Sequence, residues 1–408
     1  MNPWWEAVEK LVPRCVHPNA LTVSSCTSAI IGSCLLLGFC PYLSEYPPHW
    51  VFLVSAALFF LYQTLDAIDG KHARRLGLSS PLGQLMDHGC DIICTTPLTL
   101  LGTAIIGGGV GLRQYGVLVV SSQLLQFLYT WWELHFGVFY TATGIIGVTE
   151  AQLTVILFSI LGGIFGPEIY HVDLLQYLPS TVGIPLAKLA GAIGLSATAS
   201  VIFQLMLLGC NTMLCVLNIV MGVRRAAQPL VALMQVIVFL VYIFVQGVVY
   251  MHCLVWRPVL NPYLVYTAIC STYSILLLRL CLSATCRFPY KFIQWPMLPL
   301  AAAAAALRFG DLTVNQEFWA LLAVCLFNCV YLADFLHGLS GFEMQLAMML
   351  VELCLQAVCL FNCVYLADFV YTAVSDVCDG LNITCFTVPK AECLQAPSKS
   401  SKESKKAD

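Results

Sequence analysis

Long apolar stretches alternate with short polar stretches along almost the whole chain. Most apolar stretches hold about 20 residues, the length at which an α-helix crosses the hydrocarbon core of a bilayer. We therefore predict about ten transmembrane helices. They cover residues 21–40, 50–68, 82–108, 115–136, 151–166, 190–220, 229–252, 263–283, 316–336 and 346–371. A further apolar run, 295–307, is too short to span and suits a half-helix, an interfacial segment or a connection.

The composition supports this fold class. Of the 408 residues, 59% are hydrophobic and only 10% are charged, and the mean hydropathy is +0.83. A soluble domain of this length could not bury so much apolar surface, so we expect an all-α polytopic membrane protein. The net charge of -3 gives no basis for a nucleic-acid partner. The 20 cysteines are scattered singly, which is typical of packing residues.

The basic residues orient the predicted helices, because lysine and arginine are enriched on the cytosolic side of a membrane. They precede the first span and follow the second and the sixth, at Lys10, Arg14, Lys71, Arg74, Arg75, Arg224 and Arg225. These ends should therefore face the cytosol. An even number of spans returns the C-terminus to the same side, where four lysines lie in "KSSKESKKAD". We also find no cleavable signal peptide in the polar and aromatic residues 1–18.

Four aspartates stand out against this apolar background. Asp66 and Asp69 are three residues apart, and Asp87 and Asp91 are four apart, so each pair lies on one face of its helix. The stretch "RRLGLSS" makes the turn between the two helices, and Ser80 and Pro81 suit the start of the second helix. We predict that the two pairs converge at a chamber that faces the cytosol. Ionisable groups at membrane depth are costly and commonly mark a functional site.

Four carboxylates without a sulfur or imidazole cluster suit hard divalent cations, Mg²⁺ or Mn²⁺. Two such ions about 4 Å apart would form the usual arrangement for phosphoryl transfer. Gly70, Ala73 and Gly83 leave room for a ligand, and Arg74 offers a guanidinium to phosphate oxygens. The alternative is a solvated network in which aspartates pair with the neighbouring lysine and arginines, and Asp87 caps a helix.

The full pattern, D-x2-D-G-x2-A-R-x8-G-x3-D-x3-D, resembles the signature of the CDP-alcohol phosphatidyltransferase family. It matches at Asp66, Asp69, Gly70, Ala73, Arg74, Gly83, Asp87 and Asp91. The stretch "SSPLGQLMDHGCD" is similar to the corresponding segment of eukaryotic choline- and ethanolaminephosphotransferases. Further resemblance lies in "HPNALT" (17–22), "WWELHFG" (131–137), "GVTEAQ" (147–152) and "LNITCF" (381–386).

The resemblance implies roles for these residues. Asp66, Asp69 and Asp87 would bind one metal ion, and Asp87 and Asp91 would hold a second. Asp91 is the family's usual candidate for the base that activates the acceptor hydroxyl. His88 is the alternative, because a carboxylate bound to a dication is a weakened base.

A second group of residues would bind the nucleotide substrate or line its chamber. It comprises Asn19, Gly70, Ala73, Arg74, Gly83, Glu133 and Glu150. Asn19 could instead cap the first span. His135 and the aromatic residues Tyr129, Trp131 and Trp132 could face a cationic head group or form an interfacial belt.

The activity implied is transfer of phosphocholine or phosphoethanolamine from CDP-choline or CDP-ethanolamine to diacylglycerol. The alternatives are a CDP-diacylglycerol-dependent enzyme with an inositol, serine or glycerol phosphate acceptor, and an ion-coupled transporter. We expect four parts along the chain: a cytosolic N-terminal segment (1–20), catalytic helices (21–220), C-terminal transmembrane helices (221–380) and a cytosolic tail (381–408). A homodimer is the oligomer to test.

The C-terminal part of the sequence contains a candidate retrieval signal and an internal repeat. The end "KKAD" resembles a dilysine retrieval signal, which predicts an endoplasmic reticulum membrane with leakage to the Golgi when the signal is lost. The sequence "AVCLFNCVYLADF" occurs identically at 323–335 and 357–369. This repeat indicates a local duplication or an error in the deduced sequence.

Overall fold

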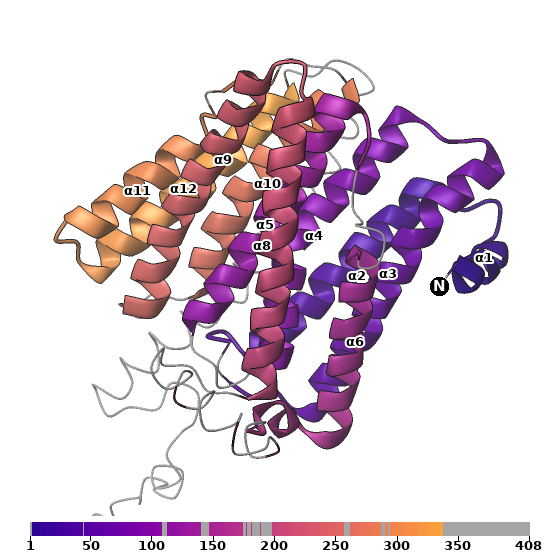
Figure 1. Ribbon diagram of the computed structural model, residues 1–408, viewed down its shortest axis with the longest axis horizontal. Coiled ribbons are helices and arrows are strands. Elements are labelled where there is room, and N and C mark those ends of the chain that lie inside the picture. The colour runs from indigo at the N-terminus through magenta and orange to yellow at the C-terminus, as the bar shows by residue number, and fades with distance from the viewer. Residues whose placement is uncertain are drawn as a thin grey trace, which may run out of the picture. The chain divides into compact units, whose positions relative to one another are not determined.

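A computed structural model describes the chain over residues 2–43, 45–107, 112–139, 147–173, 177, 181, 188, 198–256, 262–286, 290–292 and 294–337. Within these ranges the chain is helical and forms no strand, only an isolated bridge between Asp173 and Thr198. Figure 1 shows the helices. They are α1 (Asn2–Leu11), α2 (Pro18–Phe39), α3 (His49–Leu76), α4 (Pro81–Gly107), α5 (Leu112–Phe136), α6 (Val148–Phe165), η1 (Pro167–His171), α8 (Ala199–Arg225), α9 (Pro229–Tyr250), η3 (Met251–Trp256), α10 (Pro262–Cys286), α11 (Met297–Phe309) and α12 (Val314–His337).

Eight of the described helices are long and apolar enough to cross a membrane. They confirm the predicted all-α multi-pass fold. The predicted span 115–136 lies within α5, which is as long as the others but carries glutamines and serines that lower its hydropathy. Most of the short run at 295–307 lies in the 13-residue helix α11, which is too short to span a membrane. The predicted span 346–371, both the second copy of the repeat and the tail, lies outside the described residues.

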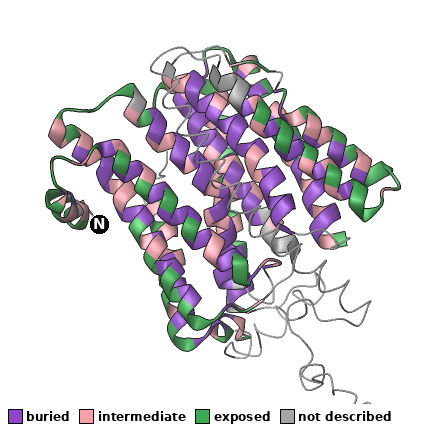
Figure 2. Cartoon of the chain, turned by 180° about the vertical axis from the view of Figure 1, so that it is seen from behind, coloured by how far each residue is buried: buried purple, intermediate pink, exposed green. Residues whose placement is uncertain are grey.

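Two helices, α4 and α10, form the centre of the described bundle. In each, about four fifths of the most apolar window is buried (78% and 83%), against 22% in α6 and α8. Helix α10 packs against α4, α5 and α12, and α2 packs against α3 and α4. Figure 2 colours the helices by this burial. The outer helices present large apolar side chains to the surface, as lipid-facing helices do.

The N-terminal helix α1 is fastened to the end of α3. Glu9 Oε1 forms an ion pair with Arg75 Nε at 2.9 Å and lies 3.2 Å from His72 Nδ1. Arg75 also donates to the Val12 carbonyl at 2.6 Å, and His72 is fully buried. These contacts fix the last turns of α3, which carry the second half of the D-x2-D-G-x2-A-R pattern.

Candidate active site

The site begins at the turn between α3 and α4. Gly77 ends α3 with a positive φ of 69°, a conformation that glycine adopts without steric cost. The amide of Leu78 then donates to the Ala73 carbonyl at 2.9 Å. Ser80 Oγ accepts from the Gly83 amide at 3.1 Å and caps α4, as the sequence predicts. The end of α3 and the start of α4 therefore lie at the same membrane face.

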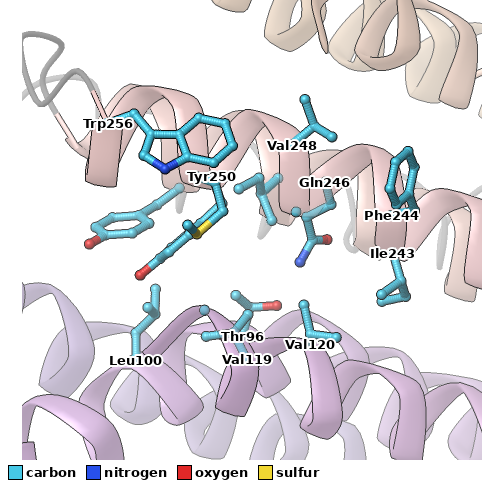
Figure 3. A pocket seen from close by; sticks show the side chains of 15 residues that line it. Thr96, Leu100, Val119, Val120, Ile243, Phe244, Gln246, Val248, Tyr250 and Trp256 are labelled. Carbon is cyan, nitrogen blue, oxygen red and sulfur yellow. The ribbon is translucent and has the colours of Figure 1, made fainter. Parts of the chain in front are cut away.

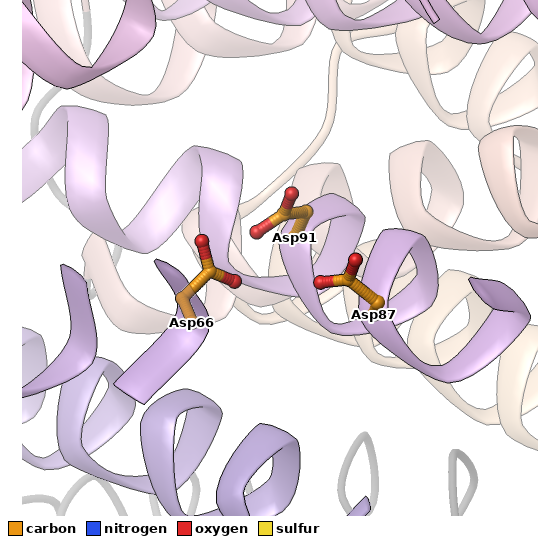
Figure 4. Close-up of side chains that lie close together, drawn as sticks. All are labelled: Asp66, Asp87 and Asp91. Carbon is orange, nitrogen blue, oxygen red and sulfur yellow. The ribbon is translucent and has the colours of Figure 1, made fainter. Parts of the chain in front are cut away.

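Three carboxylates from these two helices converge, as Figure 4 shows. One oxygen each of Asp66, Asp87 and Asp91 lies within 4.8 Å of the others, and all three residues are partly buried. No ion pair between described residues neutralises them. Like charges this close repel strongly, so a cation would stabilise the group. Three carboxylate oxygens suit Mg²⁺ or Mn²⁺, and this donor set therefore fits the expected metal.

Two hydroxyl groups hold the aspartates around this group. The Tyr62 hydroxyl donates to Asp91 Oδ1 at 2.8 Å. The Thr22 hydroxyl on α2 donates to Asp69 Oδ2, and the other oxygen of Asp69 accepts from the Gly70 amide. Asp69 is therefore buried and oriented by α2, beside the group of three and not part of it.

His88 and Glu133 form a pair next to the carboxylates. His88 Nδ1 lies 3.1 Å from Glu133 Oε2, and Gln84 Nε2 donates to Glu133 Oε1 at 2.6 Å. Glu133 is only 5% exposed, so both of its oxygens are held inside the protein. The His88 ring stacks on Phe139 with ring centroids 4.3 Å apart. Glu133 thus fixes the ring orientation and favours a proton on Nδ1 when the ring is neutral.

The residues expected to bind the nucleotide surround the α3–α4 turn. A Cβ placed on Gly83 would lie 3.8 Å from Asn19 Oδ1, and one placed on Gly70 would lie 3.5 Å from Arg74 Nη1. Ala73 and Arg74 lie in the last turn of α3, where the Arg74 side chain is exposed. The backbone amide of Asn19 donates to His17 Nδ1, which caps α2, so the Asn19 side chain is not the cap of the first span.

Other residues singled out from the sequence have structural partners. Glu150 is exposed in the first turn of α6, where its Oε2 accepts from the Gly147 amide at 2.9 Å. Trp131 Nε1 donates to Gln235 Oε1 at 3.0 Å, and His135 Nε2 lies 2.8 Å from the same oxygen. Trp132 Nε1 donates to the Asn218 carbonyl at 3.2 Å. Tyr129, Trp131 and Trp132 are all buried, so they form no interfacial belt.

Two features of the site were not anticipated from the sequence, the hydroxyls of Thr22 and Tyr62. Thr22 belongs to the quoted stretch "HPNALT", which is the only signal that could have pointed to it. Tyr62 precedes Asp66 by four residues on α3, a spacing at which side chains share a helix face. Helical spacing could therefore have suggested Tyr62 as a partner of the acidic group.

The fold and the site define an integral membrane protein with a carboxylate site at the junction of two helices. Comparison with known proteins shows what the site region resembles. Residues 15–182 match the family model of the CDP-alcohol phosphatidyltransferases, so this part of the chain is similar to that family. The matched region contains the four aspartates, His88 and Glu133. The site region is accordingly similar to enzymes of the CDP-alcohol phosphotransferase class.

Individual relatives resemble the chain over different lengths. A protein of Dictyostelium discoideum named uncharacterized CDP-alcohol phosphatidyltransferase class-I family protein 3 is 26% identical over 411 residues, 96% of this chain and 92% of that protein. Choline/ethanolaminephosphotransferase 1 of Arabidopsis thaliana is 27% identical over 80% of this chain and 85% of its own length. Cholinephosphotransferase 1 of Xenopus laevis is 34% identical, over 48% of this chain and 47% of its own length.

Proposed function

We propose that this enzyme transfers phosphocholine or phosphoethanolamine from CDP-choline or CDP-ethanolamine to diacylglycerol. The products are CMP and phosphatidylcholine or phosphatidylethanolamine. The observation that carries the proposal is the group of Asp66, Asp87 and Asp91 beside the His88–Glu133 pair. The names of the similar proteins from Arabidopsis thaliana and Xenopus laevis support the choice of alcohol.

The carboxylates would hold two Mg²⁺ or Mn²⁺ ions, with Asp66 and Asp87 toward one, Asp87 and Asp91 toward the other, and Asp69 completing the first. Bound there, the metal supplies charge neutralisation for the diphosphate and for the leaving CMP oxygen. Thr22 and Tyr62 keep Asp69 and Asp91 in fixed rotamers. Asn19 and Arg74 contact the nucleotide and its phosphates, in the space that Gly70, Ala73 and Gly83 leave open.

His88 is the base in this proposal, in preference to Asp91. Asp91 would be bound to a metal ion and accepts from the Tyr62 hydroxyl, and both interactions weaken a carboxylate as a proton acceptor. His88 Nδ1 faces Glu133, so the proton of the acceptor hydroxyl would be taken at Nε2, and Glu133 would stabilise the resulting imidazolium. The Cys281 thiol also contacts the ring, but a thiol is a weak partner that a hydroxyl can displace.

The protein is a multi-pass membrane protein. We place it in the endoplasmic reticulum membrane with both termini and the active site facing the cytosol. The basic residues in the last turns of α3 and α8 support this orientation.

The test is transfer by the purified protein in proteoliposomes. CDP-choline and CDP-ethanolamine would each be supplied with diacylglycerol and either Mg²⁺ or Mn²⁺, and release of CMP would be measured together with the lipid product. We expect product with at least one CDP-alcohol and none after chelation of the metal. Product only from CDP-diacylglycerol with inositol, serine or glycerol phosphate would show the alternative activity.

A further inference from the structure

A cavity of about 390 Å³ lies between α4 and α5 on one side and α9, η3 and α10 on the other. In Figure 3 the side chains of Thr96, Leu100, Val119 and Val120 face those of α9 and η3 across it. Its volume is within the range of small-molecule sites, roughly 300–1,000 Å³. Its residues on α4, α9 and α10 all belong to membrane-spanning segments. A ligand in this cavity would therefore come from the bilayer.

The walls of the cavity suit an apolar ligand. Two polar side chains that line it have partners within the protein, since Thr96 Oγ1 accepts from Gln123 Nε2 at 2.8 Å and Gln246 accepts from the Tyr242 hydroxyl. Phe244 (72% exposed) and Trp256 (53% exposed) also line it, so the cavity reaches the lipid-facing surface beside these two residues. A hydrocarbon chain could enter there without leaving the membrane.

Helices α4, α5 and α10 line the cavity and also carry the His88–Glu133 pair and its neighbour Cys281. His88 is on α4, Glu133 is on α5, and Cys281, which contacts His88, is on α10. Thr96 follows His88 by eight residues, or about 12 Å along a helix axis. One leaflet of a bilayer is about 15 Å deep, half of the hydrocarbon core. A long acyl chain that starts near His88 therefore reaches the cavity with its terminal part, and a short chain does not.

We propose that this cavity binds the end of one acyl chain of the lipid acceptor and makes the enzyme selective for chain length. This inference rests on the proposed function, because it takes diacylglycerol as the acceptor. The cavity contributes binding only for chains long enough to enter it. Each methylene buried there contributes about 0.8 kcal/mol.

Gly247 offers a direct test. It lines the cavity, and a Cβ added to it would meet no atom within 4 Å, so the backbone at this position leaves room for a side chain. Gly209 on α8 is the matched control, since a Cβ there also meets nothing within 4 Å and the residue is exposed outside the cavity. Leucine forms helices better than glycine at both positions. Gly116 is unsuitable, because a Cβ there would lie 2.7 Å from the Tyr250 ring.

The experiment measures transfer to diacylglycerols with chains of eight to eighteen carbons. For Gly247→Leu we expect about a tenfold loss with sixteen- and eighteen-carbon chains and little change with eight-carbon chains. Gly247→Ala should give a smaller loss of the same kind, and Gly209→Leu should match the wild type at every length. Equal loss at all lengths, or no loss with long chains, would overturn the proposal.

A second readout does not depend on turnover. A diacylglycerol with a photoreactive group at the end of one acyl chain should crosslink to peptides from α9 and η3 in the wild type, and less in Gly247→Leu. Crosslinks confined to other helices would contradict the assignment. If the wild type transfers to no diacylglycerol but the crosslink forms, the proposed function fails and lipid binding in the cavity stands.

Discussion

The two halves of α4 present opposite chemistry within one membrane helix. In the first half, Asp87 and Asp91 join Asp66 in a charged group that a bound cation would stabilise. In the second half, Thr96 and Leu100 line an apolar cavity, and the Thr96 hydroxyl there already has a partner in Gln123. The carboxylates of a metal site must hold fixed positions, because the Coulomb energy between close charges in a low dielectric changes steeply with distance. Each buried methylene of an apolar ligand, in contrast, adds only a small increment to the binding free energy. Substitutions in the two halves should therefore differ in size and in kind.

The largest loss of turnover is expected at Asp87, the carboxylate that would contact both metal ions. Asp87→Asn keeps the shape of the side chain but removes its charge, so turnover should fall by more than about 10³-fold. Turnover in proteoliposomes would be measured with saturating Mg²⁺ or Mn²⁺. Insertion and purification should stay normal, because an uncompensated carboxylate is removed and no packing atom is lost. Activity above about a tenth of the wild type would argue against a shared ligand.

The next effect concerns the base beside the charged group. His88→Ala should lower the turnover number by about 10²- to 10⁴-fold, while binding of the CDP-alcohol, measured directly, changes little. Glu133→Gln should lower turnover less, because glutamine still contacts the ring but cannot stabilise an imidazolium. Near-normal turnover of His88→Ala would return the role to Asp91.

A smaller effect is expected from the hydroxyl that orients Asp69. Thr22→Val preserves the side-chain shape and removes the hydrogen bond to Asp69 Oδ2. Hydrogen bonds to charged groups contribute about 1.5–3 kcal/mol, so we expect about a tenfold loss of turnover or more. The loss should be partly recovered at high metal concentration if Thr22 acts through metal binding. Ser28→Ala is the control, since that buried hydroxyl on α2 donates to the Ser25 carbonyl of its own helix.

The charged half of α4 could be predicted from the sequence, and the apolar half could not. Aspartates in apolar helices are rare enough to mark a site, and their spacing gave the shared faces. The residues lining the cavity, such as Leu100 and Val119, are the types that fill any helix interface, and only their arrangement leaves a space. His88 and Glu133 were each singled out from the sequence. Their pairing depends on α5 lying beside α4, and hydropathy carries no information on which helices are neighbours.

The smallest effect on activity is expected at Glu150. This residue tests whether every residue of a motif that resembles the family also contacts the substrate. The stretch "GVTEAQ" predicts a role in the substrate chamber, whereas the structure gives its side chain a local task, accepting from the Gly147 amide at the start of α6. A carboxylate there also interacts favourably with the helix dipole. Glu150→Ala should therefore lower the free energy of unfolding by only about 0.5–1 kcal/mol, seen as a small drop in melting temperature.

The KM of Glu150→Ala for the CDP-alcohol should stay within about twofold of the wild type, a smaller change than the loss of a charged substrate contact would cause. Glu150→Gln, which can still accept from the Gly147 amide, should restore the melting temperature. A clear rise in KM for both variants would place Glu150 in the chamber with Glu133 and would extend the charged region from α4 to the start of α6.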